Sequence, residues 1–418
     1  MIKNYIAKVE GHGKLNINFN KNTAHMEIDE GERLIEGIVL NRPYYDAFFI
    51  TSRICGVCPI AHNLASVTAL EDALKIKIDD TTEKLRQLMI CAQIIQSHTL
   101  HLYFLALSDY LGKKSTLALS ESNPEIFKRA LKLKKASDHL ADAAAGRNVH
   151  PITTAVGGFL KIPEKKRLVF CLEELEDAFE DAIETAKMFS AFRYPDLNNP
   201  TVYLGLANDH NYETISRTVE SSSGETFNIK NYTNNIIEKV YLGNPTKLST
   251  YKEKNFMVGA LARLSLHSRG LNPEAKKMFK GIIENFESFP AYNSFHNNFA
   301  QAIEIVHFFE EAIKILKDLI KDKNYKYNEP PKIKLRAGRG FGAIEAPRGI
   351  LYHFYELDDK GKIKNCNIIT PTAQSLNNLE SDVNAFMKNT ENLSEAKRTK
   401  LVEMLIRAYD PCITCSVH

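Results

Sequence analysis

The chain has 418 residues, of which 44% are hydrophobic and 25% charged, and its 54 basic and 51 acidic residues leave a formal charge of only +3. This composition is ordinary for a globular protein and lacks the strong positive charge that typifies nucleic-acid binding. No stretch approaches the roughly 18 apolar residues of a membrane-spanning helix, and the odd count of seven cysteines argues against a secreted disulfide framework. We therefore expect a cytoplasmic protein.

The first half of the chain changes from strand-like to helical patterning. Short alternating stretches, such as residues 14–19, predict a small sheet over residues 5–50. Apolar spacing then predicts three helices, over residues 80–110, 123–145 and 164–190. The stretch 195–255 is richer in Asn, Thr, Tyr and Gly, which predicts loops and short strands.

The second half of the chain also contains both helical and strand-like stretches. Pro273 is placed to begin a helix, and apolar residues spaced by three and four from Ala302 to Ile320 predict a long amphipathic helix that ends at 329–331. Residues 332–370 are expected to form strands, with a hairpin turn at 358–361. The last predicted helix is capped by Ser394 and reaches about Ala408.

The chain contains no repeat and no low-complexity linker, so we expect one domain over residues 1–418. Its predicted class is α+β and predominantly helical, with a long central helical bundle and small flanking sheets. Residues 1–70 hold the N-terminal sheet and a first cysteine pair, and residues 80–325 form the helical body. Residues 332–418 hold strands, the last helix and a second cysteine pair.

Two Cys-x-x-Cys motifs lie near the two ends of the chain. Cys55 and Cys58 form the first pair, and Cys412 and Cys415 form the second, 354 positions from Cys58 to Cys412. Four thiolates select zinc, iron–sulfur clusters or another thiophilic metal. Zinc ribbons close their site within tens of residues. A site that requires the whole fold to bring its ligands together points to catalysis more than to a local zinc clip.

A glycine motif, Gly338-Arg-Gly-Phe-Gly342, remains outside these assignments. Its spacing differs from that of a dinucleotide fingerprint, and no strand–helix–strand unit surrounds it. We therefore expect that nicotinamide does not bind to this chain.

The motifs resemble those of the large, catalytic chain of nickel–iron hydrogenases. Arg53-Ile-Cys-Gly-Val-Cys-Pro-Ile-Ala-His62 and Asp410-Pro-Cys-Ile-Thr-Cys-Ser-Val-His418 carry the resemblance. Val9-Glu-Gly-His-Gly13, Ser97-His-x-x-His101, Gly146-Arg-x-x-His-Pro151, Glu345-Ala-Pro-Arg-Gly349 and Ile369-Thr-Pro-Thr372 follow in the order of that family. The resemblance covers essentially the whole chain and is strongest to the cytosolic NAD(P)-linked hydrogenases, including the sulfhydrogenases.

This resemblance implies a nickel–iron centre whose iron carries two cyanides and one carbon monoxide, and which cleaves dihydrogen reversibly and heterolytically. Cys55 and Cys412 would be terminal nickel ligands, and Cys58 and Cys415 would bridge nickel and iron. Thiolates suit this role because they are electron-rich and lose their protons on metal binding. A terminal thiolate, that of Cys412, would take the proton, and Glu10 would be its first relay.

The resemblance also assigns residues around the centre. Arg348 and Thr372 would donate hydrogen bonds to the cyanides of the iron, with Pro371 also at the cofactor, and Arg348 and Asp410 would form a charged canopy over the open metal position. His62 would donate a hydrogen bond to a bridging sulfur.

A second, hard metal is implied as well. The resemblance places magnesium at Glu36, His418 and the backbone carbonyl of Ile368, which is consistent with the preference of magnesium for oxygen ligands. His98 and His101 lie three residues apart and could share a metal by spacing, but the resemblance makes them packing and hydrogen-bonding residues.

Several partners follow from the resemblance. Electrons would leave through an iron–sulfur small subunit, because the cysteines left in this chain are too few to ligate clusters, and then through flavin and NAD(P) diaphorase subunits. A maturation protease and nickel chaperones would complete the site, and the protease would cut just beyond His418. The alternatives are a deazaflavin-reducing or heterodisulfide-reductase-linked hydrogenase, a non-catalytic relative in a respiratory complex, and a zinc-stabilised scaffold.

Overall fold

The computed structural model describes residues 2–113, 117–207, 212–283 and 292–418. Its helices are α1 (Ile35–Val39), α2 (Tyr44–Thr51), α3 (Pro59–Leu74), α4 (Asp80–Leu100), α5 (Leu107–Tyr110), α6 (Leu117–Ser122), α7 (Pro124–Ala145), α8 (Lys165–Ser190), α9 (Tyr232–Asn235), α10 (Ala260–His267), α11 (Pro273–Ile283), α12 (Asn297–Lys321), α13 (Pro371–Asn389), α14 (Glu395–Ala408) and α15 (Ile413–Ser416). A π-helical segment, His101–Ala106, joins α4 to α5.

The strands form five small sheets, none with more than four strands in the described ranges. They are β1 (Ile2–Tyr5), β2 (Gly13–Asn18), β3 (Thr23–Ile28), β4 (Thr154–Ala155), β5 (Gly158–Phe159), β6 (Val202–Ala207), β7 (Thr218–Ser221), β8 (Thr226–Asn228), β9 (Ile236–Lys239), β10 (Leu248–Tyr251), β11 (Phe256–Met257), β12 (Gly338–Ala346), β13 (Gly349–Leu357) and β14 (Ile363–Ile369). The orders are β1-β2-β3, β4-β5, β11-β6-β7-β8, β10-β9 and β12-β13-β14.

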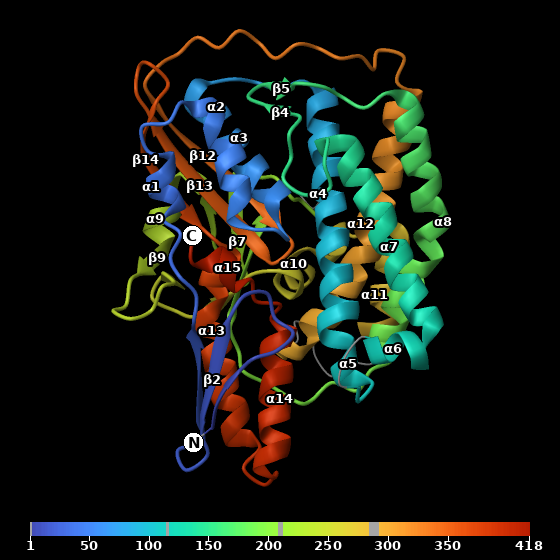
Figure 1. The fold of residues 1–418 in the computed structure, drawn as a ribbon, viewed down its shortest axis with the longest axis vertical. Helices are drawn as coiled ribbons and strands as arrows, with labels where there is room; N and C mark the ends of the chain where they lie inside the picture. The colour runs from blue at the N-terminus through green and yellow to red at the C-terminus, as the bar shows by residue number, and fades with distance from the viewer. Residues whose placement is uncertain (1, 114–116, 208–211, 284–291) are drawn as a thin grey trace.

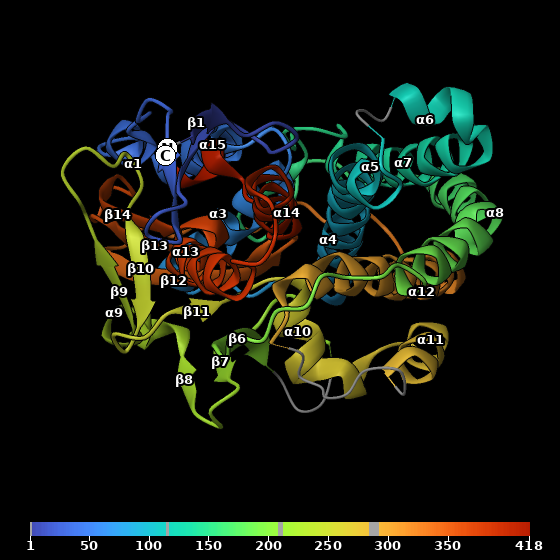
Figure 2. The same cartoon turned by 90° about the horizontal axis from the view of Figure 1, so that it is seen from below.

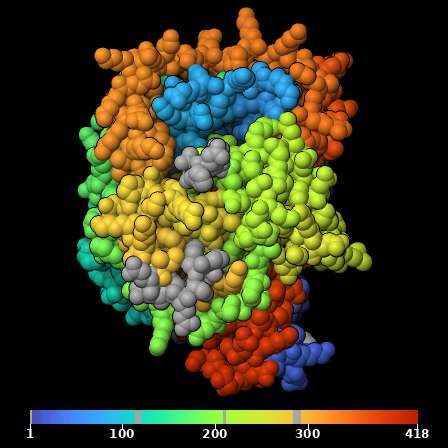
Figure 3. Space-filling view, turned by 180° about the vertical axis from the view of Figure 1, so that it is seen from behind, coloured from blue at the N-terminus to red at the C-terminus, as the bar shows by residue number. Residues whose placement is uncertain are grey.

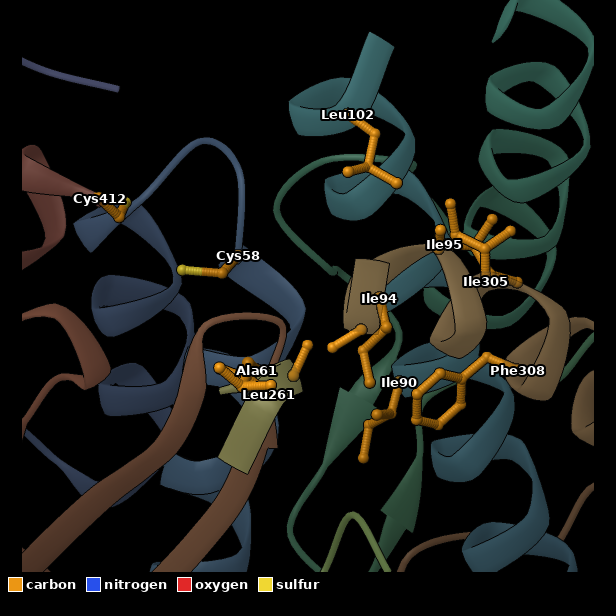
Figure 4. Packing of buried hydrophobic residues seen from close by; sticks show 14 of the residues in the cluster. Cys58, Ala61, Ile90, Ile94, Ile95, Leu102, Leu261, Ile305, Phe308 and Cys412 are labelled. Atoms are coloured by element: carbon orange, nitrogen blue, oxygen red, sulfur yellow. The ribbon is translucent and has the colours of Figure 1, made fainter. Parts of the chain in front are cut away.

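One side of the molecule is a bundle of the long helices α4, α7, α8 and α12 (Figure 1). Local sequence defines their ends: the Asp79 carboxylate accepts a hydrogen bond from the Thr82 amide at 2.8 Å, and Pro124 occupies the first position of α7. Gly146 then adopts φ +74° and ends α7. The apolar faces meet in a core that includes Ile94 and Phe308 (Figure 4).

The other side of the molecule carries the sheets, and α3 packs on the antiparallel sheet β12-β13-β14. Figure 2 shows the sheets and the helical bundle as two neighbouring halves, with α15 beside the sheet half. Gly338, Gly340 and Gly342 allow α3 to approach closely: a Cβ at Gly340 would lie 1.9 Å from the Ala69 carbonyl oxygen. The glycine motif of the sequence therefore serves helix-on-sheet packing.

The two ends of the chain are tied together. The sheet β1-β2-β3 packs against α13, and these elements project with α14 at one end of the molecule (Figures 1 and 3). The amide of Ile413 donates to the Glu10 carbonyl at 3.0 Å, and the amide of Arg33 donates to the Val417 carbonyl at 3.1 Å. The second cysteine pair is thus anchored by the N-terminal region.

Most predicted elements are confirmed, with local corrections. The predicted helices from residue 80 onward are present, and the strands of 332–370 pair around a turn in which the Gly361 amide donates to the Asp358 carbonyl. The sheet expected over 5–50 ends at Ile28, because α1 and α2 occupy the rest of that stretch. The long helix α12 ends at Lys321, before the expected Pro-Pro stop, and α3 and α13 were not predicted. The α+β, largely helical class is confirmed.

We predict that Gly340→Ala destabilises the protein strongly, by at least about 1–3 kcal/mol, because the added methyl group meets backbone atoms of α3 that cannot rotate away. Gly281→Ala, inside α11, has no heavy atom within 4 Å of the added carbon and should be neutral or slightly stabilising. Denaturant unfolding of both variants measures the difference. Equal stability of the two would contradict the role assigned to the glycine face of β12, which is formed by Gly338, Gly340 and Gly342.

Candidate metal centre

The four motif cysteines come together in one buried cluster. Cys58 precedes the first residue of α3, whereas Cys412 and Cys415 flank and enter the short helix α15. All four sulfur atoms lie within 4.8 Å of one another. The Sγ atoms of Cys55 and Cys412 are 3.3 Å apart, and those of Cys58 and Cys415 are 4.0 Å apart. Figure 4 shows Cys58 and Cys412 beside the apolar core.

The thiols differ in their surroundings. Hydrogen bonds from the other three thiols hold the pKa of Cys55 well below its usual range, and the amides of Val57 and Cys58 also point at its sulfur, at 3.3 Å each. Burial raises the pKa of Cys412 well above its usual range. Thiols lose their protons when they bind a metal, and Cys55 is the one whose surroundings favour the thiolate most directly.

Arg348 and Asp410 form a buried ion pair beside the cluster. Arg348 donates from Nε to the Asp410 carbonyl at 2.6 Å and from Nη2 to the carboxylate at 2.7 Å. Asp410 has φ +51°, a left-handed conformation that is costly for a residue with a side chain. The side-chain amide of Gln301 donates to the same carboxylate at 3.0 Å, and Gln301 in turn faces His101 at 2.6 Å.

A buried charge network holds the turn that carries Arg348. Arg263 donates to both carboxylate oxygens of Glu304 at 2.6 Å and to Glu345 at 2.8 Å. It also donates to the carbonyls of Ala346 and Pro347, at 3.1 and 3.0 Å. The guanidinium lowers the pKa of Glu304 to about 2, against the effect of burial. Arg348 is therefore held by a network that begins on α10 and α12.

His98 and His101 face different partners in the described part of the chain. The Nε2 atom of His98 faces the Glu304 carboxylate at 2.7 Å, whereas His101 faces Gln301 and, at 2.7 Å, the Arg407 carbonyl. Their hydrogen-bonding partners differ although both side chains are buried. The geometry agrees with packing and hydrogen-bonding roles.

A small cavity next to Cys412 is lined by Arg348, Pro371, Thr372 and Ser375, together with apolar side chains. The Nη1 atom of Arg348 is buried and has no hydrogen-bond partner among the described residues. The Thr372 hydroxyl accepts a hydrogen bond from the Cys412 amide at 2.9 Å, which leaves its own hydrogen available. The cavity thus offers two donors for a small polar ligand beside the metal position.

Glu10 is the carboxylate next to Cys412. Residues 10 and 412 form a parallel β-bridge, and the Glu10 carboxylate hydrogen-bonds to Cys412 and accepts from the Thr414 amide at 3.1 Å. Burial, followed by the nearby Cys55, raises the pKa of Glu10. This carboxyl group is suited to exchanging a proton with the neighbouring sulfur.

His62 reaches the cluster from α3. Its Nε2 atom lies 3.1 Å from the Cys415 sulfur, and its Nδ1 atom lies 3.2 Å from Nε2 of His353. Complete burial lowers the pKa of His62 to about 3, so the imidazole is neutral and has one donor and one acceptor nitrogen. His353 has no counterpart among the residues expected from sequence.

Glu36, His418 and the Ile368 carbonyl also lie together, near the end of the chain that follows Cys415. His418 Nε2 is 2.9 Å from the Ile368 carbonyl oxygen and 3.8 Å from Glu36 Oε1. The second oxygen of Glu36 accepts from the Lys247 ammonium at 2.7 Å. His418 and Lys247 hold the pKa of Glu36 at about 2, despite burial. The Glu36 carboxylate, the Ile368 carbonyl and the His418 imidazole, all possible metal ligands, therefore lie within a few ångströms of one another.

Sequence reasoning missed Arg263, Glu304, Gln301 and His353. The signal available for Arg263 and Glu304 was a charged residue inside an otherwise apolar helical stretch, which marks a buried pair without naming the partner. Gln301 and His353 carry no comparable signal, because a polar residue in a buried helix or strand is often satisfied by backbone.

Comparison with known proteins gives the class of this chain. The family model described as nickel-dependent hydrogenase matches residues 33–138 and 210–418. Together with the four-cysteine cluster, this match shows that the chain belongs to the nickel-dependent hydrogenases as the large, metal-binding chain of a nickel–iron enzyme, and hence that it is an oxidoreductase.

Individual relatives show which hydrogenases the chain is similar to. The chain is 33% identical over 419 residues to the alpha chain of sulfhydrogenase 1 of Pyrococcus furiosus, covering 99% of this chain and 96% of the relative. It is 27% identical over 472 residues to the beta chain of the NAD-reducing hydrogenase HoxS of Cupriavidus necator, covering 99% and 93%. A solved NAD+-reducing [NiFe]-hydrogenase in the H2-reduced state matches with a TM-score of 0.86 and 25% identity over all of both chains.

None of the helices within the described ranges is both long enough and apolar enough to cross a membrane.

We predict that Arg263→Met destabilises the protein by about 3–5 kcal/mol, because it leaves two buried carboxylates without their cation. The exposed Arg269→Met, six residues along the chain, should change stability by no more than about 0.5 kcal/mol. Thermal and denaturant unfolding measure both variants. A neutral Arg263→Met would mean that the network does not hold the Arg348 turn.

Proposed function

We propose that the cysteine cluster holds a nickel–iron centre, with Cys55 and Cys412 as terminal nickel ligands and Cys58 and Cys415 as bridging ligands. The proposal is supported by four buried sulfur donors within 4.8 Å that pair across the two motifs. When bound, the centre supplies the position at which dihydrogen is polarised and cleaved heterolytically. A structural zinc site would need the thiols but not the polar surroundings described next.

The single observation that carries the proposal is the Nη1 atom of Arg348, which is buried without a partner among the described residues, on a side chain that lines the cavity with Thr372 and Pro411. A buried guanidinium donor without a partner is costly, so its natural partner is a bound group. We assign Arg348, Pro371 and Thr372 to the two cyanides and one carbon monoxide of the iron, with the arginine and the threonine hydroxyl as donors. A zinc scaffold gives these donors nothing to bind.

The chain's own residues then move the proton. The Cys412 thiolate accepts it, and Glu10, which hydrogen-bonds to this sulfur and has a raised pKa, receives it next. Beyond Glu10, the Thr414 hydroxyl donates to Glu30 at 3.4 Å, and Glu30 faces the exposed ring of His12 at 2.9 Å. The proposed outlet follows these polar groups toward the surface.

Arg348 and Asp410 act in the proposal as the canopy that keeps a fixed charge beside the open metal position. Their two hydrogen bonds and the Gln301 contact fix the orientation of the guanidinium. His62 donates a hydrogen bond to the bridging sulfur of Cys415. Such a hydrogen bond withdraws electron density from a thiolate and tunes the metals that it bridges.

We also propose a magnesium ion at Glu36, His418 and the Ile368 carbonyl. Support comes from the convergence of these three groups and from the charge of Glu36, which stays ionised to low pH. Magnesium keeps several waters in such sites, which would complete its coordination beside these three groups.

The proposed complex includes an iron–sulfur small subunit, flavin and NAD(P) diaphorase subunits, a maturation protease and nickel chaperones, and its compartment is the cytoplasm. Cys91, Cys171 and Cys366 lie outside the cluster and cannot complete an iron–sulfur site here. The NAD link is supported by the NAD-reducing relatives. The chain would form one domain, with segments 1–70, 80–325 and 332–418 contributing its sheet, bundle and metal-binding end.

A deazaflavin-reducing or heterodisulfide-reductase-linked hydrogenase is the second candidate. The observation behind it is a 32% identity over 406 residues to the large chain of a vhu-type F420-non-reducing hydrogenase of Methanocaldococcus jannaschii. Because F420 is a deazaflavin, the name of that relative favours the heterodisulfide-linked form over the deazaflavin-reducing one. Hydrogen-dependent reduction of NAD(P), a deazaflavin and a heterodisulfide by the whole complex distinguishes the candidates.

The test of the centre is elemental analysis with infrared spectroscopy on the purified complex. We expect one nickel per large chain, iron in excess of nickel because the small subunit carries iron–sulfur clusters, and cyanide and carbonyl stretching bands. Cys412→Ser should lose the nickel and the bands, whereas Cys171→Ser, which alters a buried thiol outside the cluster, should keep them. Zinc without these bands in the unaltered protein would overturn the proposal.

We predict that Glu10→Gln keeps the metals but slows the exchange of isotopes between dihydrogen and deuterated water roughly a hundredfold or more. The glutamine amide cannot carry the proton away from Cys412. The exposed Glu32→Gln is the matched control and should retain full exchange. Wild-type exchange in Glu10→Gln would remove this residue from the proposed relay.

A further inference from the structure

Behind the cluster, polar side chains of α3 and β13 form a continuous buried row. His62 lies between the Cys415 sulfur at 3.1 Å and His353 at 3.2 Å. His353 Nδ1 lies 3.0 Å from the Tyr355 hydroxyl, which in turn lies 2.9 Å from the Ser66 hydroxyl. The ring-bearing side chains of the row are at most 1% exposed, so water does not compete for their hydrogen bonds.

The glycine face of β12 creates this meeting. In the antiparallel pair, Gly342 lies opposite His353, and Gly340 lies opposite Tyr355. Paired residues project to the same face of a sheet, and here that face is covered by α3. Because these β12 positions carry no side chain, the helix descends onto the sheet, and its polar residues reach those of β13.

The hydrogen bonds of this row have a determined direction. With metal bound, the Cys415 thiolate could only accept, so Nε2 of His62 would donate and its Nδ1 would accept. The proton between the two rings then belongs to Nε2 of His353. A ring that donates from Nε2 accepts at Nδ1, here from the Tyr355 hydroxyl at 3.0 Å.

We propose that His353 and Tyr355 are positioning residues: they fix the tautomer of His62 that donates to Cys415, and so they set the electron density that this sulfur gives to the metals. The inference rests on the proposed function, in which Cys415 bridges nickel and iron. Tyr355 acts three hydrogen bonds away from the sulfur, because each neutral ring can hold only one proton between its two partners.

The test compares four variants of the purified complex by infrared spectroscopy and nickel content. Tyr355→Phe removes the donor to His353, and His353→Leu removes both hydrogen bonds. A weaker hydrogen bond on the sulfur leaves more electron density on the iron, so the carbonyl and cyanide bands should shift to lower wavenumber with nickel unchanged.

Two matched variants serve as controls. Tyr352→Phe also removes a buried tyrosine hydroxyl from β13, but that hydroxyl has no partner among the described residues, so the bands should stay at their wild-type positions. His353→Gln keeps a donor toward His62 and an acceptor toward Tyr355, and it should restore the wild-type bands.

Unshifted bands in Tyr355→Phe, with full nickel content, overturn the inference and leave the proposed function intact. Equal shifts in Tyr355→Phe and Tyr352→Phe also overturn it, because they would indicate a general loosening of β13. Absence of nickel and of the bands from the unaltered complex overturns the proposed function itself, and the inference with it. If His353→Leu does not fold, Tyr355→Phe and its control decide the question.

Discussion

The close approach of α3 to the glycine face of β12 is the packing constraint on which the rest of the site depends. A methyl group at Gly340 would lie 1.9 Å from the Ala69 carbonyl oxygen, so the helix rests on the strand backbone itself. The helix begins directly after Cys58 and carries His62 one turn later. The packing of α3 on the sheet therefore determines where the first cysteine pair lies. The loop before the helix only adds the position of Cys55.

The second cysteine pair depends on a different constraint, the joining of the chain ends. The Glu10 carbonyl accepts a hydrogen bond from the Ile413 amide, and Arg407 of α14 pairs with Asp109 at 2.6 Å. These contacts anchor the C-terminal segment to the N-terminal sheet and to the helical bundle. The two cysteine pairs are thus positioned by contacts that span the whole fold, whereas a short zinc-binding loop carries all its ligands locally.

Sequence patterns predicted what periodicity and motif spacing can encode. Long amphipathic helices such as α8 and α12 show a clear 3.6-residue repeat, and the cysteine motifs indicated a joint metal site. Helix α3 was not predicted because nearly all its residues are buried. It therefore lacks the contrast between a polar and an apolar face on which the prediction depends. The meaning of Gly338, Gly340 and Gly342 could not be deduced without α3, which lies far away in the sequence. The partners of the buried charges could not be predicted for a related reason. Arg263 pairs with Glu304 and Glu345, which lie 41 and 82 positions away, and a periodic pattern does not identify the partner of a charge.

Two local costs are concentrated at the same place in the molecule. Asp410 holds a left-handed backbone conformation, and Nη1 of Arg348 is buried without a partner among the described residues. Each such feature typically costs about 1–3 kcal/mol. Both residues belong to one ion pair, held from α12 by Gln301 and from α10 by Arg263. The surrounding network over-determines this pair, so the protein itself fixes the orientation of the Arg348 guanidinium. Such preorganisation is what a site needs when its donors must match a small ligand that cannot itself adapt.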